Sequence, residues 1–478
     1  MDNETPLEFD VLDALNRRTP TGFYWSLSLL ATIGGFLFGY DTANIGSALN
    51  FIPFPLHGFA MGYLVASTSI GAAVGAFFAG PLTDRFGRKS MLIIDAGVYA
   101  AGAILSAVAW QGAVLLTART LIGLAIGADS AIATAYISEY APSGRRGALS
   151  FLQQWMITVG ILISYIIAMI VLNAMPGKAG GLDWRLILGL GAVPALIGLA
   201  FRTVMPESPR WLLRTGRYEK MQAALSRLGV DATIKQIRET AEHLAESEKR
   251  DRGTAGGRRW TRGVWRALIV VCVFFIFQQI TGINIPLYYG PHILSPLLGG
   301  GSSTVQSAIA SVEVTTIMAA VNVIASYFGF RYIDRIGRRR MSMGGYTGMA
   351  VSMLLSAAAL TYSSGLAQVI LVMIGLDGFI ASFAIGVGGT GWILQGEVFP
   401  TEIRGSAAAI AASVDWLANY ALIQAFPAWK AGIGLAGVMV CFAALSVLAI
   451  LFIARFLPET KDIPVEEVIR RFEVQARS

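Results

Sequence analysis

Cysteine, histidine and charged residues are all scarce in this chain of 478 residues. The cysteines and histidines are scattered along the sequence: Cys272, Cys441, His57, His243 and His292. Disulfide frameworks and metal sites need several such side chains at short spacing, so we expect no disulfide, no metal ion and no cofactor. Charged residues make up only 14% of the chain, which excludes an ordinary water-soluble protein of this length.

Long apolar stretches take the place of the missing charge. Hydrophobic residues make up 55% of the chain, and the mean hydropathy is +0.60. Apolar windows of about 20 residues, the length that crosses a bilayer, recur along the chain. They predict twelve transmembrane helices, over residues 23–49, 59–80, 91–110, 113–138, 149–174, 184–205, 264–292, 307–331, 342–362, 366–396, 405–428 and 431–456. The polar stretch 1–20 lacks the pattern of a cleaved signal peptide, so we expect the first helix to direct insertion.

Basic residues fall mainly in alternate loops between these helices. Arg85, Arg88 and Lys89 follow the second helix, Arg146 follows the fourth, and the cluster 335–340 follows the eighth. Such asymmetry is typical of cytoplasmic loops. It predicts a multi-pass protein of the cell membrane with both termini in the cytoplasm. The net charge of +7 therefore indicates topology and contact with the lipid bilayer, and we expect no binding to nucleic acid.

Three motifs occur twice, in the same order, on either side of a polar insert. The paired segments are 84–88 and 334–338, 139–147 and 397–405, and 206–208 and 458–460. This repetition indicates duplication, and it predicts two six-helix halves with a binding site between them near the midplane of the membrane. The expected units are an N-terminal half at 1–206, a cytoplasmic helical linker at 207–262, a C-terminal half at 263–457 and a cytoplasmic tail at 458–478.

The repeated loops carry acids and bases that can pair with one another and cap the ends of helices. We predict that they form a gate at the cytoplasmic ends of the two halves. Anchoring of the topology and capping of loops, without a gating role, is the alternative. The predicted gate residues are Asp84, Arg85, Arg88, Glu139, Arg146, Asp334, Arg335, Arg338, Glu397 and Arg404.

Residues 274–290, FFIFQQITGINIPLYYG, place amides within an apolar helix. Unsatisfied amides are costly in hydrocarbon, so these side chains should face a protein interior or a cavity. On a regular helix Gln278 and Asn284 would point about 240° apart. Gly282 and Pro286 should let the helix unwind and turn the amides toward one point. We predict a substrate site, with ordinary polar packing in a helix bundle as the alternative.

Taken together, these motifs resemble the sugar porter family of the major facilitator superfamily. The resemblance runs from Gly35 to Thr460, through GFLFGYDTANIG, DRFGRK, ARTLIGLAIG, PESPRWL, QQITGIN, DRIGRR and EVFPTEIRG in order. It implies an all-α integral membrane protein with twelve transmembrane helices in two six-helix pseudo-symmetric halves, the major facilitator fold. We also expect a functional monomer.

The resemblance implies a set of sugar-binding positions. Neutral amides can both donate to and accept from sugar hydroxyls, and aromatic rings suit the apolar faces of a pyranose. Asp415 stands where the family usually has a neutral amide, and this acid could bind hydroxyls, pair with a cation or titrate. The tenth helix has Gly388-Gly389 where Gly-Pro is usual, which should change its bend. The predicted substrate-binding residues are Phe38, Gln154, Gln278, Gln279, Asn284, Tyr288, Asn322, Trp392, Asp415 and Trp416.

Asp41 and Arg119 are charges within the apolar first and fourth helices, where pairing relieves the cost of burying both. In proton-coupled members of the family, the matching acid takes up the proton and the matching arginine modulates it. The resemblance thus implies import of a monosaccharide, a hexose or pentose, with the proton as coupling ion.

Two other readings of the pair stay open. If it is only structural, the chain would be a facilitative sugar or polyol uniporter, for example for inositol. A weakly transporting membrane sugar sensor is the third possibility, although its signalling tails would be expected to be longer. An enzyme is not expected, because no nucleophile with its base, metal cluster or phosphate loop occurs at helical spacing.

Overall fold

The computed structural model describes residues 10–17, 22–56, 59–140, 146–175, 179–254, 260–298, 304–400, 403–461, 463 and 465–475, and every regular element within them is helical. A short π-helix lies at Ala179–Asp183. The α-helices are α1 (Val11–Arg17), α2 (Gly22–Ala31), α3 (Ile33–Ala48), α4 (Phe59–Phe86), α5 (Arg88–Ala107), α6 (Gly112–Tyr140), α7 (Arg146–Ala174), α8 (Trp184–Gly189), α9 (Ala192–Thr203), α10 (Pro209–Arg214), α11 (Tyr218–Arg227), α12 (Ile234–Thr254), α13 (Arg262–Ile280), α14 (Asn284–Leu298), α15 (Thr304–Ile336), α16 (Arg338–Tyr362), α17 (Gly365–Gly386), α18 (Thr390–Val398), α19 (Arg404–Phe456) and α20 (Val465–Gln475).

Within the described residues these helices build twelve membrane-spanning segments, as predicted from the sequence. Six segments are single helices, namely α4, α5, α6, α7, α15 and α16. Four are broken along their length and consist of α2 with α3, α8 with α9, α13 with α14, and α17 with α18. The eleventh and twelfth segments are joined as α19, which turns sharply at Gly434, where φ is 73°.

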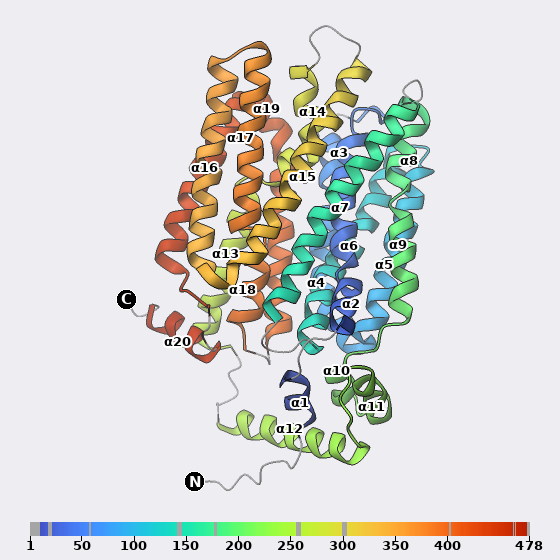
Figure 1. The fold of residues 1–478 in the computed structure, drawn as a ribbon, viewed down its shortest axis with the longest axis vertical. Coiled ribbons are helices and arrows are strands. Elements are labelled where there is room, and N and C mark those ends of the chain that lie inside the picture. Colours follow the sequence, from blue (N-terminus) through green and yellow to red (C-terminus); the bar gives the residue numbers. More distant parts are fainter. Residues whose placement is uncertain are drawn as a thin grey trace.

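The segments form two six-helix halves that stand side by side (Figure 1). Contacts between the halves come mainly from three pairs of helices, α4 with α19, α7 with α15, and α3 with α14. One helix of each pair belongs to the first half and the other to the second. A site shared by these pairs therefore lies between the halves, which is the arrangement that the duplicated motifs predict.

Helices α4 and α6 pack most closely within the first half because both carry glycines at their crossing. Gly71 and Gly75 of α4 face Gly123 and Gly127 of α6. A methyl group at any of these four positions would overlap a backbone carbonyl oxygen of the facing helix. Small residues spaced four apart allow such close approach in membranes, where van der Waals packing replaces the hydrophobic effect between helices.

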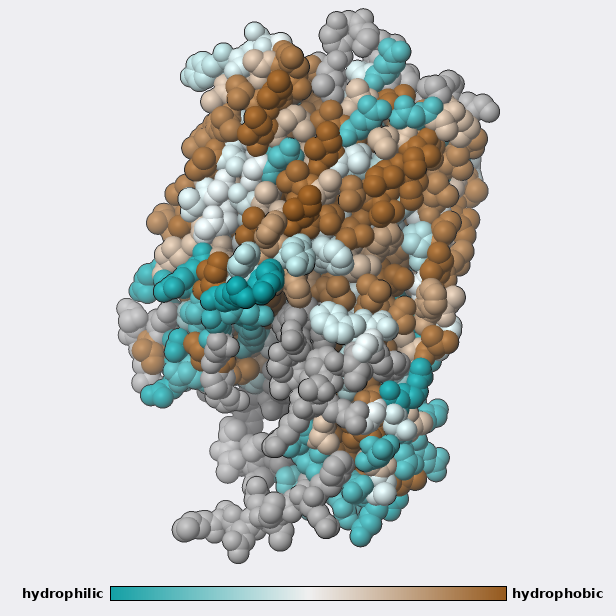
Figure 2. Space-filling model, in the orientation of Figure 1, coloured by the Kyte–Doolittle hydropathy of each residue, from teal (hydrophilic) through white to brown (hydrophobic). Residues whose placement is uncertain are grey.

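The polar insert forms a separate layer at one end of the bundle, which we call the insert end. Helices α10, α11 and α12 lie there beside α1, and α20 packs against α13 nearby (Figure 1). Ser208 begins the layer by capping α10, since its Oγ accepts from the backbone N–H of Trp211 at 3.2 Å. Hydrophobic side chains dominate the long flank of the bundle, while hydrophilic ones gather at the insert end (Figure 2).

Alanine substitutions at two glycines of α4 test the close crossing. Gly75→Ala should lower the thermal unfolding temperature of the detergent-solubilised protein, because the methyl group meets the Leu124 carbonyl oxygen; overpacking of this kind costs about 1–3 kcal/mol. Gly80→Ala is the matched control, since nothing lies within 4 Å of its added carbon. Equal unfolding temperatures in the two variants would contradict the proposed packing.

Candidate functional site

The seventh membrane segment unwinds at its centre, where the sequence places its amides. Helix α13 ends at Ile280, and α14 begins at Asn284. Gly282 occupies the gap with φ of 97°, a backbone conformation that glycine adopts without strain. Pro286 contributes differently from the prediction, because it lies in the first turn of α14, where a missing N–H leaves no helical bond unmade.

The break lets a network of buried amides connect the two halves. Asn284 Nδ2 donates to Gln279 Oε1 at 2.8 Å and to Asn419 Oδ1 at 2.9 Å. Gln279 Nε2 donates to Asp415 Oδ1 at 2.7 Å. Asn419 Nδ2 in turn donates to Ser69 Oγ on α4 at 3.1 Å. Only this last bond of the four crosses from the second half to the first.

Gln278 points away from this network, so the two neighbouring glutamines do not converge. Its Nε2 donates to the Gly388 carbonyl at 3.2 Å, at the break between α17 and α18. A methyl group on Gly388 would lie 3.3 Å from Gln154 Nε2 on α7, which places Gln154 at the same break. The Gln278 Oε1 atom is buried without a hydrogen-bond partner among the described residues. Gln278 of α13 and Gln154 of α7 therefore form a second group of polar side chains, separate from the network around Gln279.

Two pairs of aromatic side chains pack near these amides. Trp392 of α18 meets Phe275 edge-on, with ring centroids 5.6 Å apart. Phe38 of α3 meets Trp416 of α19 edge-on at 4.8 Å, so this pair joins the two halves. The Trp416 indole N–H is buried with no acceptor in the described part of the chain.

The remaining predicted substrate residues lie on α14 and α15. Tyr288 of α14 accepts a hydrogen bond from Thr42 Oγ1 of α3 at 3.3 Å. Asn322 of α15 is buried, with 4% of its surface exposed. All ten predicted substrate residues are thus inside the bundle or half-buried, on helices that meet between the halves.

Asp41 of α3 and Arg119 of α6 form a bidentate ion pair. Arg119 Nη1 and Nη2 donate to the two Asp41 carboxylate oxygens at 3.2 and 3.1 Å. Arg119 Nε donates to the Leu64 carbonyl at 2.9 Å. The two side chains are 0% and 1% exposed, so each charge depends on the other for compensation; removing one partner of such a pair typically costs about 3–5 kcal/mol.

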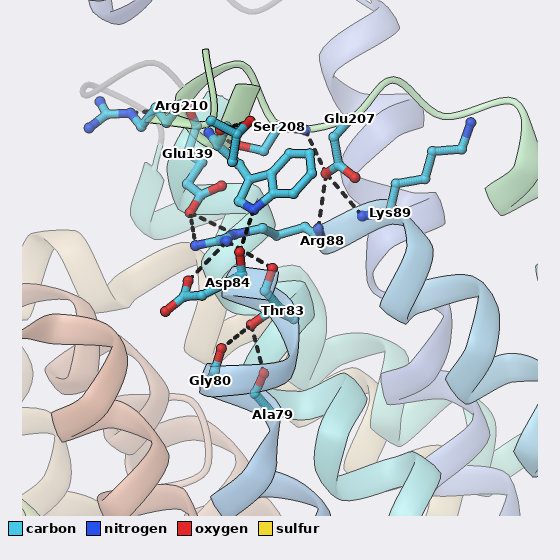
Figure 3. Close-up of polar contacts among 12 residues, drawn as sticks. Ala79, Gly80, Thr83, Asp84, Arg88, Lys89, Glu139, Glu207, Ser208 and Arg210 are labelled. Carbon is cyan, nitrogen blue, oxygen red and sulfur yellow. Dashed lines mark hydrogen bonds and ion pairs between the residues drawn. The ribbon is translucent and has the colours of Figure 1, made fainter. Parts of the chain in front are cut away.

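Three predicted gate residues of the first half, Asp84, Arg88 and Glu139, lie together at the insert end (Figure 3). Arg88 Nη1 lies 3.1 Å from Asp84 Oδ1, and its Nη2 lies 2.9 Å from Glu139 Oε1. Glu207 Oε1 accepts from the backbone N–H groups of Arg88 and Lys89 at 3.0 and 3.1 Å, and so caps α5.

The second half repeats this cluster around Arg338. Arg338 Nη2 lies 2.9 Å from Asp334 Oδ1 and 2.6 Å from Glu397 Oε1. Glu459 Oε1 accepts from the Arg338 backbone N–H at 2.8 Å, which caps α16. Thr460 Oγ1 adds a bond to Glu397 Oε2 at 2.7 Å. These ion pairs join residues of the same half in both copies.

Two further predicted gate residues, Arg85 and Arg335, make no ion pair in these clusters among the described residues. Arg85 and Arg335 are exposed, and the Arg85 guanidinium lies over the Phe86 ring. The side chains of Arg146 and Arg404 lie outside the described residues. Sequence reasoning gave no role to Glu207 and Glu459, although their repeated Pro-Glu motif was the available signal. Asn419 and Ser69 gave no comparable signal, since each is a single polar residue in an apolar helix.

The family model described as sugar (and other) transporter matches residues 27–472. The chain belongs to this sugar transporter family. It is 33% identical to the arabinose-proton symporter of Bacillus subtilis (strain 168), over 97% of this chain and 98% of the relative. It is 35% identical to the glucose transporter GlcP of Staphylococcus epidermidis, over 94% of this chain and 97% of the relative.

A solved sugar transporter structure has the same fold. The proton:xylose symporter XylE, from E. coli, was solved with 6-bromo-6-deoxy-D-glucose bound. It superposes with a TM-score of 0.78 at 29% identity, covering 94% of this chain and 99% of XylE. The predicted family and the twelve-helix fold are thereby confirmed. The roles of the individual site residues stay predictions.

Loss of the Gln279 side chain tests its prediction as a sugar ligand. Gln279→Ala should raise the sugar concentration for half-maximal uptake about tenfold, because a lost buried hydrogen bond costs about 1–3 kcal/mol. Uptake into proteoliposomes measures this. Gln424→Ala serves as the control, because that amide is more exposed than Gln279. Its Nε2 donates to the carbonyl of Phe59, the first residue of α4. An unchanged half-maximal concentration would remove Gln279 from the site.

Proposed function

We propose that this chain imports a monosaccharide together with a proton, by alternating access between its two halves. The observation that carries the proposal is the buried Asp41–Arg119 pair, which adjoins residues in contact with the second half. The relatives support the sugar and the proton together, since they include an arabinose-proton symporter and a proton:xylose symporter. A hexose or a pentose fits the same set of amides and rings.

Protonation of Asp41 is the proposed coupling step. A neutral carboxyl no longer compensates Arg119, whose guanidinium keeps its bond to the Leu64 carbonyl. Loosening this pair frees α3 to shift relative to α6. Thr42, the next residue on α3, bonds to Tyr288 of α14, so the shift reaches the broken helix directly. Protonation thereby biases the two-state equilibrium of the carrier.

Sugar binding acts on the same broken helix in this proposal. Hydroxyls would exchange bonds with Gln279 and Asn284, which already bond to each other and to Asp415 and Asn419. Because Asn419 bonds to Ser69 across the halves, rearrangement of the network changes the contact between them. One proton moving through 100 mV supplies about 2.3 kcal/mol, enough for somewhat more than tenfold accumulation.

The insert end faces the cytoplasm in this proposal, with both termini on that side of the cell membrane. The units are the halves 1–206 and 263–457, the linker 207–262 and the tail 458–478, and the chain works as a monomer. The clusters around Arg88 and Arg338 hold the helix ends of each half rigid, so that they move as gate elements. Basic loops at this end support the orientation.

Uptake into proteoliposomes tests the proposal. Radiolabelled hexoses, pentoses and inositols are supplied with and without an imposed inward proton gradient. We expect one or a few monosaccharides to accumulate uphill and to leak out when a protonophore is added. Uptake that only equilibrates, with or without the gradient, would identify a facilitative uniporter, and binding without uptake would identify a sugar sensor.

Asp41→Asn tests the coupling step. The amide imitates the protonated acid, so proton-driven accumulation should be lost while exchange of internal for external sugar continues. Asp377→Asn is the matched control, because Asp377 is another acid within a membrane helix, half-buried on α17. Accumulation that persists in Asp41→Asn would show that another acid carries the proton.

A further inference from the structure

A second group of buried charges lies in the first half, separate from Asp41 and Arg119. Arg202 of α9 is 1% exposed. Its Nη1 donates to Asp95 Oδ1 of α5 at 2.6 Å, and its Nη2 donates to Asp129 Oδ1 of α6. Further bonds join the guanidinium to the backbone carbonyls of Leu92 and Ala31. One arginine is thus shared by two carboxyl groups from different helices.

The charge of this group does not balance if both acids are ionised. Asp95 and Asp129 are 4% and 3% exposed, so water does not compensate an excess negative charge. Two carboxylates at one site repel each other, and in known acid pairs one of them keeps a proton. A single proton makes the group of Asp95, Asp129 and Arg202 neutral.

The positions of the carboxylate oxygens also indicate that one of the two acids carries a proton. The outer oxygens of the two acids, Asp95 Oδ2 and Asp129 Oδ2, are buried with no donor among the described residues. Their other oxygens, Asp95 Oδ1 and Asp129 Oδ1, both accept from the same Arg202 guanidinium. Two carboxylates offer only acceptors, so one of these acids can donate a hydrogen bond only when it is protonated.

A small cavity adjoins the group. Asp95, Asp129 and Arg202 line it together with Leu37 and Tyr99. One water molecule is the most that a cavity of this size holds, and a buried water needs two to four polar partners. The outer carboxylate oxygens and the unbonded Arg202 Nε would supply those partners.

The cavity lies between Asp41 and the insert end. Gly34, Leu37 and Asp41 are spaced at i, i+3 and i+7, so they share one face of α3, over a rise of about 10 Å. At Gly34 an added methyl group would overlap the Asp129 carboxyl, which therefore packs directly against α3. On the opposite side, Arg202 is in the last turn of α9, beside the insert.

Tyr99 of α5 stands between the two acidic sites. Its hydroxyl donates to the Leu37 carbonyl at 3.1 Å, and its ring lines the cavity. The titratable and charged groups around this tyrosine, from the helices packed against it, are Tyr40, Asp41 and Arg119. Tyr99 therefore joins the cavity to the turn of α3 that leads to Asp41.

We propose that Asp95 and Asp129 hold one proton between them against Arg202, and that this pair relays the coupling proton from Asp41 to the insert end. The pair first releases its proton toward the insert end. A proton then leaves the Asp41 carboxyl and binds the vacant carboxylate, and no other bond forms or breaks. The relay rests on the proposed proton coupling, whereas the shared proton does not.

Infrared spectroscopy of the full-length protein in lipid vesicles tests the shared proton. At neutral pH the wild type should show a carbonyl stretch from a protonated carboxyl group. Asp95→Asn and Asp129→Asn should each remove this band, because Arg202 then faces a single carboxylate and the group is neutral without a proton. Asp41→Asn, Asp377→Asn and Asp415→Asn should leave the band in place, which distinguishes it from a band of any of those three acids. A band that survives in both Asp95→Asn and Asp129→Asn, or is absent from the wild type, would overturn the proposal.

Transport measurements on the same variants test the relay. Asp129→Asn should slow proton-driven uptake about tenfold or more, since a positioned proton carrier typically contributes 10²- to 10⁴-fold to a proton-transfer step. Sugar exchange without net proton movement should keep the wild-type rate, because it needs no proton transfer through the pair. Equal losses of uptake and exchange would show a structural role only, and an unchanged uptake rate would also overturn the relay.

The two proposals can fail separately. Uptake by the wild type that ignores the proton gradient would contradict proton coupling and the relay with it. The infrared band would still report whether Asp95 and Asp129 share a proton, because that measurement needs neither sugar nor a gradient.

Discussion

The Asp41–Arg119 pair is the interaction on which the proposed transport cycle depends. Both charges are fully buried inside the first half, in a part of the membrane where water cannot compensate them. The pair is therefore stable only while Asp41 is ionised, and a proton converts it into an uncompensated arginine. In the proposed cycle this small chemical change has a large energetic effect, and the hydrogen bond between Thr42 and Tyr288 would transmit it to the broken helix of the second half.

The two halves share the same charged clusters at their helix ends, but they differ in the polar residues that they bury. The clusters around Arg88 and Arg338 repeat in their acids, their distances and their capping glutamates. The buried polar groups do not repeat in this way, since, in the part of the chain that the structure describes, the ion pairs inside the bundle belong to the first half and the connected amides mainly to the second. The first half would therefore handle protons and the second half sugar, with α3 and α14 in contact between them.

The sequence predicted the fold and the helix break well, and the directions of side chains less well. Apolar windows and Gly282 have local physical consequences, so the twelve segments and the unwound α13–α14 joint could be predicted. The separation of Gln278 from Gln279 could not, because it depends on the Gly388 carbonyl, which is remote in sequence. The group around Arg202 gave the same signal as Asp41, a charge in an apolar helix, but its partners come together only in the folded bundle.

The most direct test of the coupling account is the distance between the halves as a function of pH. Spin labels at the exposed positions Val204 and Arg455, in a chain whose Cys272 and Cys441 are replaced by serine, report this distance by pulsed electron resonance. The account predicts that acidification shifts the wild-type distances to those of Asp41→Asn, which should keep that distribution at every pH. A distribution that ignores pH in the wild type, or that titrates equally in Asp41→Asn, would contradict it.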